Sequence, residues 1–408
     1  MFKSANPFMA VVAVLIYAIA VRAGDDPKWL KDARARESKP IPATPLASKD
    51  GWMGAVVPAK VVGAIEKDGI SYGLELDIGG EQHVYCEIFP DGFDAADRMR
   101  RMLATTMQQI SQSNGKIEMR AIDSTDAGVF GSVPYLRADW LYRVNDGKES
   151  KLGGLKQIAL EKDGHGIYCA HADIGYSKTF TNVVNALATT LQAAAAASAP
   201  YYTEISTATI LGHKVGYTVT SLTRDGEGDT EMRRKSALLL ATPAGAAASQ
   251  DAMYKEWVHP DASLINALHL VSDNGEISSN VTLSRRDDRW IIVGDHRHAA
   301  VTQTLAPDAT PGTWVGQSLA LRKLLAGAHP VGSEVALPLW MIADPTKLTE
   351  VRTKVVSKAG SKQYAATMTA GGVVMNATLD ALGTMPSSEI RIGQQTVEME
   401  RVYVNGKF

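Results

Sequence analysis

The sequence predicts an α+β fold in two parts, a duplicated strand-strand-helix module followed by a β-rich curved sheet or half-barrel. Two observations predict this fold. A residue pattern occurs twice in the first half of the chain, and apolar and polar residues alternate through much of the second half, as is typical of strands with one buried face. The chain of 408 residues is too long for one ordinary domain, because most domains have roughly 100–200 residues.

The first 23 residues have the three parts of a secretory signal peptide. Lys3 is the only charged residue before an apolar run from Phe8 to Val21, and Ala23 precedes Gly24. A basic start, an apolar core and small residues before the cut are typical of export signals. The run is shorter than the roughly 20 residues of a membrane-spanning helix. We therefore predict cleavage after Ala23, no membrane span thereafter, and a mature protein in a bacterial periplasm or outside the cell; a retained anchor is the alternative.

Two further features of the sequence are the composition of the next segment and the net charge. Residues 24–50 are charged and then rich in proline, with few large apolar groups. Such a segment buries too little apolar surface to offset the conformational entropy that it would lose on ordering, so we expect a flexible leader. Without Lys3 and Arg22 the chain has 40 basic and 44 acidic residues, a net charge of −4. Because binding to phosphates needs a dense positive surface, this balance argues against nucleic acid as a partner.

The duplicated α+β domain is expected in residues 51–198. One pattern occurs within residues 85–107 and again within residues 168–191. It consists of Tyr-Cys, then five residues, then glycine followed by an aromatic residue, and later Leu-Ala-Thr-Thr. Each copy leads from an alternating segment into one with helical apolar spacing, so we expect two strand-strand-helix halves related by a pseudo-twofold axis, with the helices on an antiparallel sheet. Asp94 and Ser177 are the expected N-cap residues of the two helices. Chance similarity of the two segments is the alternative.

The two cysteines, Cys86 and Cys169, occupy equivalent places in these copies. In an oxidising compartment two thiols of one domain are commonly joined, and equivalent strands beside a pseudo-twofold axis would bring them together, so we predict a disulfide. The alternative is a zinc site, because His165, Cys169 and His171 share one face of the predicted strand. Residues two apart on a strand are separated by about 7 Å, too far for several of them to reach one ion without a bend. We therefore predict no metal and no other cofactor.

Residues 199–408 are expected to form the β-rich domain, with one helix over residues 315–325. Two polar groups occur in this part. His296 and His298 on one strand end are candidates for metal binding or proton transfer, and the carboxylates of Asp225–Asp229 are candidates for calcium binding. We interpret the first group as a solvated rim and the second as a hairpin tip, because turns and strand ends are rich in such residues.

The familiar catalytic signatures are missing from the sequence. Gly316–Ala320 comes nearest to the nucleophile elbow of hydrolases but lacks its closing glycine. We therefore expect a non-enzymatic binding or interaction protein with no identifiable catalytic residue. Its partner is expected to be a protein, such as an envelope-acting toxin that an immunity protein neutralises. An apolar small molecule, in a pocket lined by residues such as Trp340, Met341 and Met375, is the other expected partner. An envelope hydrolase with a site built from distant residues is the alternative function.

Overall fold

The computed structural model describes residues 26–194, 199–242, 246–341, 343–393 and 395–408. The predicted signal peptide, residues 1–23, lies outside this part of the chain. The protein is mostly β, with 57% of residues in strands and 14% in helices, and the described part has four helices. The α+β fold class predicted from the sequence is therefore wrong.

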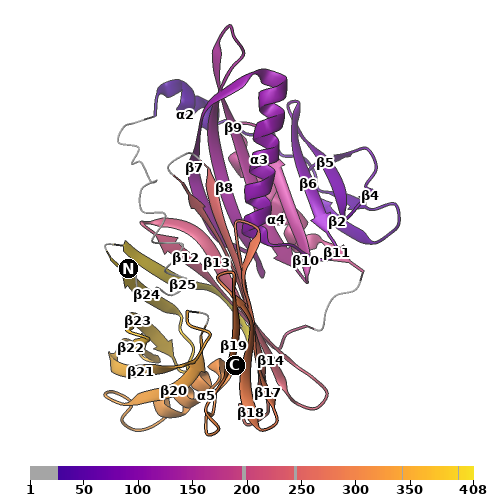
Figure 1. The fold of residues 1–408 in the computed structure, drawn as a ribbon. Helices are drawn as coiled ribbons and strands as arrows, with labels where there is room; N and C mark the ends of the chain where they lie inside the picture. Colours follow the sequence, from indigo (N-terminus) through magenta and orange to yellow (C-terminus); the bar gives the residue numbers. More distant parts are fainter. Residues whose placement is uncertain (1–25, 195–198, 243–245, 342, 394) are drawn as a thin grey trace. The chain divides into compact units, whose positions relative to one another are not determined.

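The described residues divide into two compact units (Figure 1). The N-terminal unit contains residues up to 194, together with 237–242 and 246–249, and the C-terminal unit contains residues from 199 to 236 and from 250 onward. Their apolar cores consist of different residues, so each unit is stabilised by the packing of its own core.

The N-terminal unit has three described helices and two sheets. The helices are α2 (Lys28–Arg34), α3 (Ala95–Asn114) and α4 (Ser177–Thr190). A small sheet has the order β1-β2-β11, with β1 (Thr44–Ala47), β2 (Met53–Val57) and β11 (Gln192–Ala193). The eight-stranded antiparallel sheet has the order β3-β5-β6-β10-β9-β8-β7, with β4 also paired with β5. Its strands are β3 (Lys60–Val62), β4 (Lys67–Asp68), β5 (Ser71–Gly79), β6 (Gln82–Phe89), β7 (Lys116–Phe130), β8 (Val133–Asn145), β9 (Ser150–Lys162) and β10 (His165–His171).

A disulfide joins two neighbouring strands within the larger sheet. β6 pairs with β10 so that Cys86 stands directly opposite Cys169, with their Cα atoms 4.1 Å apart and their sulfurs bonded. The predicted disulfide is thus confirmed. Because the two residues are 83 positions apart, the bond closes a long loop and limits the conformations of the unfolded chain.

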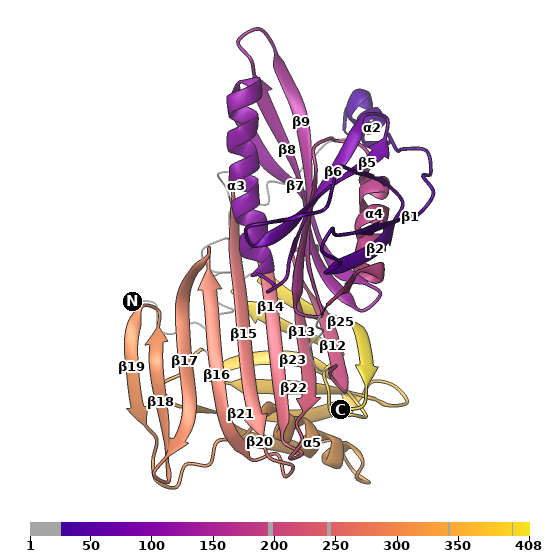
Figure 2. The same cartoon turned by 90° about the vertical axis from the view of Figure 1, so that its right-hand side faces the viewer.

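The helices α3 and α4 lie on opposite faces of this sheet, as Figure 2 shows. Phe180 and Leu187 of α4 share a core with Ile158 of β9. The neighbouring Gln157 points to the other face, where its amide donates to the Met99 carbonyl of α3 (3.5 Å). A twofold axis between antiparallel strands runs perpendicular to the sheet and would leave both helices on one face. The two copies therefore correspond in their paired strands but not in the placement of their helices. The expected symmetric module, with both helices on one face of the sheet, is not formed.

Strands β7 and β8 are the main elements that the sequence pattern did not predict. They form a hairpin of 15 and 13 residues whose ladder is interrupted by bulges between Ile117 and Met119 and between Ile122 and Ser124. A bulge shifts the two-residue alternation by one position, so a search for strict alternation fails across it. The hairpin completes the sheet at the β7 edge and adds much of the strand content.

A 14-stranded antiparallel sheet and the helix α5 (Trp314–Leu325) form most of the C-terminal unit. The first eight strands are β12 (Tyr202–Ile210), β13 (His213–Arg224), β14 (Thr230–Ala241), β15 (Ala247–Val258), β16 (Leu264–Asp273), β17 (Glu276–Arg286), β18 (Arg289–His296) and β19 (Ala299–Thr304). The others are β20 (Glu334–Trp340), β21 (Leu348–Lys358), β22 (Gln363–Ala370), β23 (Val373–Asp380), β24 (Ser387–Ile392) and β25 (Gln395–Gly406). β12 pairs with β25, so β19 and β20 are the two edges of the sheet.

The sheet bends on itself, and side chains of the unit fill its inner face. Trp340 of the edge strand β20 packs against His269 of β16, with ring centroids 4.6 Å apart. The first amides of α5, those of Trp314 and Val315, donate to the buried carboxylate of Glu256 on β15 at 3.1 and 2.9 Å. Glu256 thus satisfies donors that a helix start leaves without an intrahelical partner, and this fixes α5 to the sheet.

Residues 26–50 differ from the flexible leader expected from their composition. They contain α2 and β1, and β1 pairs with β2. Leu30 is the buried residue of α2, and Leu46 of β1 belongs to the apolar core of the unit. Between them, residues 31–41 bury no side chain fully, and the ion pairs described below hold this part of the segment. Within the described part of the chain, every helix is too short or too polar to span a bilayer.

Removal of the disulfide is expected to destabilise the protein by about 2–4 kcal/mol, because the unfolded chain regains the freedom that loop closure removes. Urea unfolding of the Cys86→Ala/Cys169→Ala variant, followed by circular dichroism, measures this loss. A reductant should lower the stability of the wild-type protein similarly and leave the variant unchanged. Equal stability of variant and wild type would contradict the prediction.

Candidate functional site

A charged cleft in the N-terminal unit is the candidate functional site. Its cavity has a volume of about 420 Å³ and is lined by α2, β7, β8, β9, the loop after β10 and the start of α4. The charged and hydroxyl-bearing residues that line it include Arg34, Asp123, Asp139, Lys156, Asp173 and Ser177. We call it the Lys156 cleft. A ligand that enters it meets charged groups of both signs.

Lys156 forms the buried floor of this cleft. The residue is 4% exposed, and its ammonium group donates to the backbone carbonyls of Asp173 and Ile174, the latter at 3.0 Å. Burial lowers the pKa of Lys156 to about 8, while the nearby carboxylates of Asp139 and Asp173 oppose this shift. The group is therefore a hydrogen-bond donor whose charge changes in mildly alkaline solution.

Two glycines allow close backbone approaches to the loop after β10. A Cβ atom on Gly154 would lie 2.8 Å from the Cα of Ile174, and one on Gly175 would lie 2.6 Å from the Ala33 carbonyl oxygen. Both distances are shorter than heavy-atom contacts allow, so a side chain at either position would displace the backbone beside it. Glycine at position 154 therefore allows the loop to lie against β9 beside Lys156, and glycine at position 175 allows residues 33–36 to lie against the loop.

Asp139 of β8, which lines the cleft, forms a charged pair with Arg137 of the same strand. Two nitrogens of the Arg137 guanidinium donate to the two carboxylate oxygens of Asp139, at 2.9 and 2.8 Å. The guanidinium also donates to the hydroxyl oxygens of Ser177 and Thr181 in α4, at 2.6 and 2.7 Å. Arg137 thereby fixes the first turn of α4 against the sheet, and the Ser177 hydroxyl oxygen is engaged by a cation and not by a general base.

A segment that we call the N-terminal strap, residues 26–41, lies along the cleft. One guanidinium nitrogen of Arg34 is 2.7 Å from both carboxylate oxygens of Asp123, and Arg36 pairs with Asp173 at 2.8 Å. The Arg36 carbonyl accepts a hydrogen bond from the Tyr176 amide at 2.6 Å. The strap is thus held through its backbone and its charged side chains, in the manner of a bound peptide.

Glu37 of the strap caps helix α4. Its carboxylate accepts from the backbone amides of Lys178 and Thr179, each at 2.8 Å, and from the Thr179 hydroxyl at 2.6 Å. Burial raises the pKa of Glu37, but these hydrogen bonds and the charge of Lys156 outweigh it, so the pKa is lowered. An anion at a helix start is also stabilised by the helix dipole.

The two residues expected as N-caps do not cap their helices. Ser177 is already the first residue of α4, and Asp94 stands at the N-cap position of α3 but its side chain makes no capping hydrogen bond. A cap supplied by a distant segment leaves no signal beside the helix, so Glu37 is a functional contact that local sequence reasoning missed.

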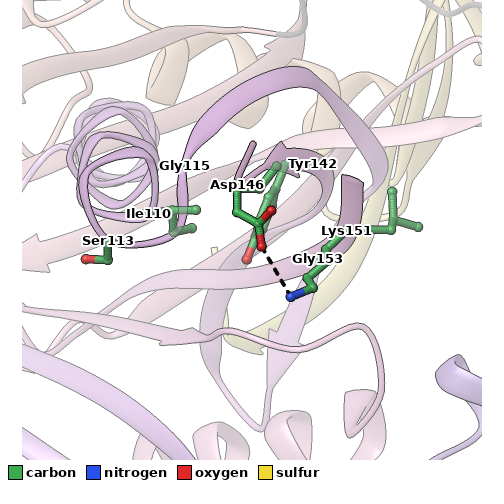
Figure 3. Close-up of a pocket in the computed structure, with 9 residues that line it drawn as sticks. Ile110, Ser113, Gly115, Tyr142, Asp146, Lys151 and Gly153 are labelled. Atoms are coloured by element: carbon green, nitrogen blue, oxygen red, sulfur yellow. Dashed lines mark hydrogen bonds and ion pairs between the residues drawn. The ribbon is translucent and has the colours of Figure 1, made fainter. Parts of the chain in front are cut away.

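A second cavity, of about 470 Å³, lies at the C-terminal end of α3 near the turn between β8 and β9 (Figure 3). Burial raises the pKa of Tyr142, which lines it. A Cβ atom on Gly153 would lie 2.4 Å from the Tyr142 ring, so the glycine makes room for this side chain. Asp146 and Lys151 face each other there at 3.5 Å. This ion pair is partly solvated, whereas the charge of the first cleft is buried, so the Lys156 cleft is the stronger candidate.

The residues of the alternative metal site do not converge on an ion. Cys169 is in the disulfide and offers no thiolate. His165 and His171 are buried, and their Nδ1 atoms lie 2.6 and 2.9 Å from the carbonyl oxygens of Pro90 and His83. Among the residues that the structure describes, no cluster of three histidine, cysteine, aspartate or glutamate side chains is arranged to hold a metal.

The two polar groups of the C-terminal unit lie at turns. Arg297 and His298 form the turn between β18 and β19 and have positive φ angles of 52° and 63°. The Nδ1 atom of His296 lies 3.0 Å from the Ser279 hydroxyl. Asp225 accepts hydrogen bonds from backbone amides of its own hairpin turn. The contacts of Asp225 stabilise its own turn, and the contact of His296 joins the neighbouring strands β18 and β17.

The place expected for an apolar ligand is filled by side chains. Trp340 is 2% exposed and Met375 is 7% exposed, and the Trp340 indole N–H donates to the Pro345 carbonyl at 2.9 Å. The His269 ring packs against the rings of Tyr254 and Trp340. Burial lowers the pKa of His269 to about 3, so this imidazole is neutral at physiological pH. The inner face of the sheet around Trp340 is thus a packed core.

Comparison with solved structures finds low-scoring matches to part of this chain, among them the two described below. No family model matches the chain, and no curated protein matches it in sequence. A β-barrel-like protein of the domain of unknown function DUF1849 from Brucella abortus has a TM-score of 0.39 and 9% identity, and the match covers 50% of this chain and 97% of that one. A DUF1089 family protein from Pseudomonas aeruginosa has a TM-score of 0.25 and 12% identity, and the match covers 41% of this chain and 87% of that one.

The buried ammonium of Lys156 is expected to make stability rise with pH in mildly alkaline solution. Its pKa is lowered from 10.5 to about 8 on folding, so between these values the unfolded state binds more protons and the free energy of unfolding increases with pH. Below about pH 8 the full cost of the buried charge is present. Urea unfolding at several pH values should show the rise in wild type and in Lys178→Met, an exposed control, and not in Lys156→Met. An identical pH dependence in all three proteins would contradict the shift.

Replacement of Glu37 by alanine is expected to cost about 1 kcal/mol and to loosen the strap, because two amides of α4 lose their acceptor. Hydrogen exchange should accelerate at the amides of Lys178 and Thr179 and within residues 34–38. Glu37→Gln keeps an acceptor oxygen without the charge and should give an intermediate effect. Unchanged exchange in Glu37→Ala would show that the strap does not cap α4.

Proposed function

We propose that this chain is an exported, non-enzymatic binding protein whose partner is another protein, and that the Lys156 cleft takes part in the contact. The export signal predicted for residues 1–23 from their sequence supports a periplasmic or extracellular site of action. The observation that carries the proposal is the strap, because a polypeptide segment already lies along the cleft through the Arg36 carbonyl and the side chains of Arg34 and Glu37. The donors and acceptors of the cleft therefore suit a polypeptide.

The distribution of charge supports a protein partner over an apolar small molecule. Trp340, Met375 and their neighbours pack the inner face of the large sheet, where a hydrophobic ligand would need an open concavity. Paired charges line the Lys156 cleft instead. Complementary charges across an interface contribute mainly specificity and association rate, which suits recognition of one partner among many envelope proteins.

An immunity-type role, in which the protein neutralises an envelope-acting toxin, is the specific form of this proposal. Such an inhibitor needs arginine or aromatic anchors on an accessible surface. The strap supplies both, since Trp29 is 55% exposed and the side chain of Arg36 is 52% exposed. These two residues are our candidate anchors for the partner.

Differential capture tests the proposal. The mature protein and an Asp123→Asn/Asp173→Asn variant are immobilised and exposed to envelope extract, and the captured proteins are quantified by mass spectrometry. An Asp287→Asn/Asp288→Asn variant, changed in the turn between β17 and β18, is the control with the same change in charge. One protein should bind wild type and control and bind the cleft variant at least about tenfold more weakly, since a loss of roughly 1.4 kcal/mol gives this factor.

Two other results would contradict the proposal. Capture that is unaffected by the cleft variant would remove the Lys156 cleft from the contact. A stoichiometric apolar molecule extracted from the purified protein would favour a carrier, and turnover of ester, peptide or glycan substrates would favour the envelope hydrolase.

A further inference from the structure

One edge of the 14-stranded sheet is open to pairing. β19 pairs with β18 on one side and is the last strand of the sheet at that end, as Figure 2 shows. Five of its six residues are exposed and the sixth, Val301, is partly exposed. The backbone amides and carbonyls on the outer side of such a strand form a template for another strand.

The opposite edge of the same sheet is blocked. β20 contains Pro338, which has no amide hydrogen to donate, and begins with the charged Glu334. The Gly312 amide donates to the Pro338 carbonyl at 2.9 Å and so occupies part of this edge. Proline, charge and a covering segment are the means by which proteins prevent edge-to-edge association.

The edges of the two smaller sheets are also protected. β7 carries five charged residues and two bulges over its 15 residues. β3, β1 and β11 have three, four and two residues, too short for extended pairing. Among the sheet edges in the described ranges, those free of charge, proline and bulges are β11, with only two residues, and β19, with six.

We propose that β19 pairs antiparallel with β19 of a second copy of this chain, giving a dimer with one continuous sheet. The sequence of the strand, Ala-Ala-Val-Thr-Gln-Thr, is uncharged, so two copies meet without like-charge repulsion. An interface that uses the same surface of both copies closes after two subunits. Because β20 is blocked, the sheet does not extend further, and a dimer rather than a filament results. This surface belongs to the C-terminal unit and is independent of the proposed role of the Lys156 cleft.

Lysines placed on the edge strand test this interface against a matched control. Through their partners on β18, Ala300 is aligned with Asn280 and Thr302 with Thr282 of β17, which is not an edge strand. Light scattering after size exclusion should give a dimer mass for wild type and for Asn280→Lys/Thr282→Lys. The Ala300→Lys/Thr302→Lys variant should be a monomer, or should dissociate at concentrations at least tenfold higher, with an unchanged circular dichroism spectrum. A monomeric wild-type protein, or an edge variant as dimeric as the control, would overturn the proposal.

Single cysteines give a second readout that does not depend on loss of binding. The two native cysteines are joined to each other, so a cysteine introduced on β19 is a unique thiol. In Ala300→Cys, Val301→Cys and Thr302→Cys, oxidation should cross-link subunits most at the position nearest the twofold axis, and the Thr282→Cys control should remain uncross-linked. Equal cross-linking at Thr282 and at β19 would indicate random collision and overturn the proposal.

Discussion

The pairing of β6 with β10 is the contact on which the N-terminal unit depends. It brings together segments that are 83 residues apart, and the Cys86–Cys169 bond holds the two strands in one register. On its other side β10 pairs with β9, and there Lys156 stands opposite His171, the last residue of β10. This second pairing places the ammonium group of Lys156 beside the carbonyls of the loop that follows β10.

The buried charge of Lys156 is unfavourable for folding and is maintained by its polar neighbours. A buried ammonium group is unfavourable, and the lowered pKa of Lys156 expresses this cost. Two carbonyl oxygens and nearby carboxylates offset part of it, and Arg137 connects the same region to α4. The strap adds Arg34, Arg36 and Glu37 to this network, so a segment with little apolar burial becomes ordered through charged contacts.

The C-terminal unit depends instead on the bending of its large sheet. A sheet of 14 strands is long enough to curl, and here it bends so that Trp340 near one edge meets His269 in the other half. Helix α5 lies against the inner face because Glu256 accepts from its first amides. The interior is therefore a packed core.

The amino-acid sequence by itself determined the features that depend on near neighbours. Alternation located many strands, the apolar spacing of Phe180, Val183 and Leu187 identified the buried side of α4, and the equivalent positions of Cys86 and Cys169 predicted their bond. The bulged strands β7 and β8 escaped because a bulge breaks the alternation.

Only the tertiary structure decided what depends on the path of the chain. It placed α3 and α4 on opposite faces of the sheet, which overturned the symmetric α+β module. It also brought Glu37 to the start of α4 and buried Lys156 beneath the loop of Asp173. Periodicity reports whether a residue faces inward, but it carries no information about which distant segment covers it, because that choice depends on strand order and on the packing of the whole unit.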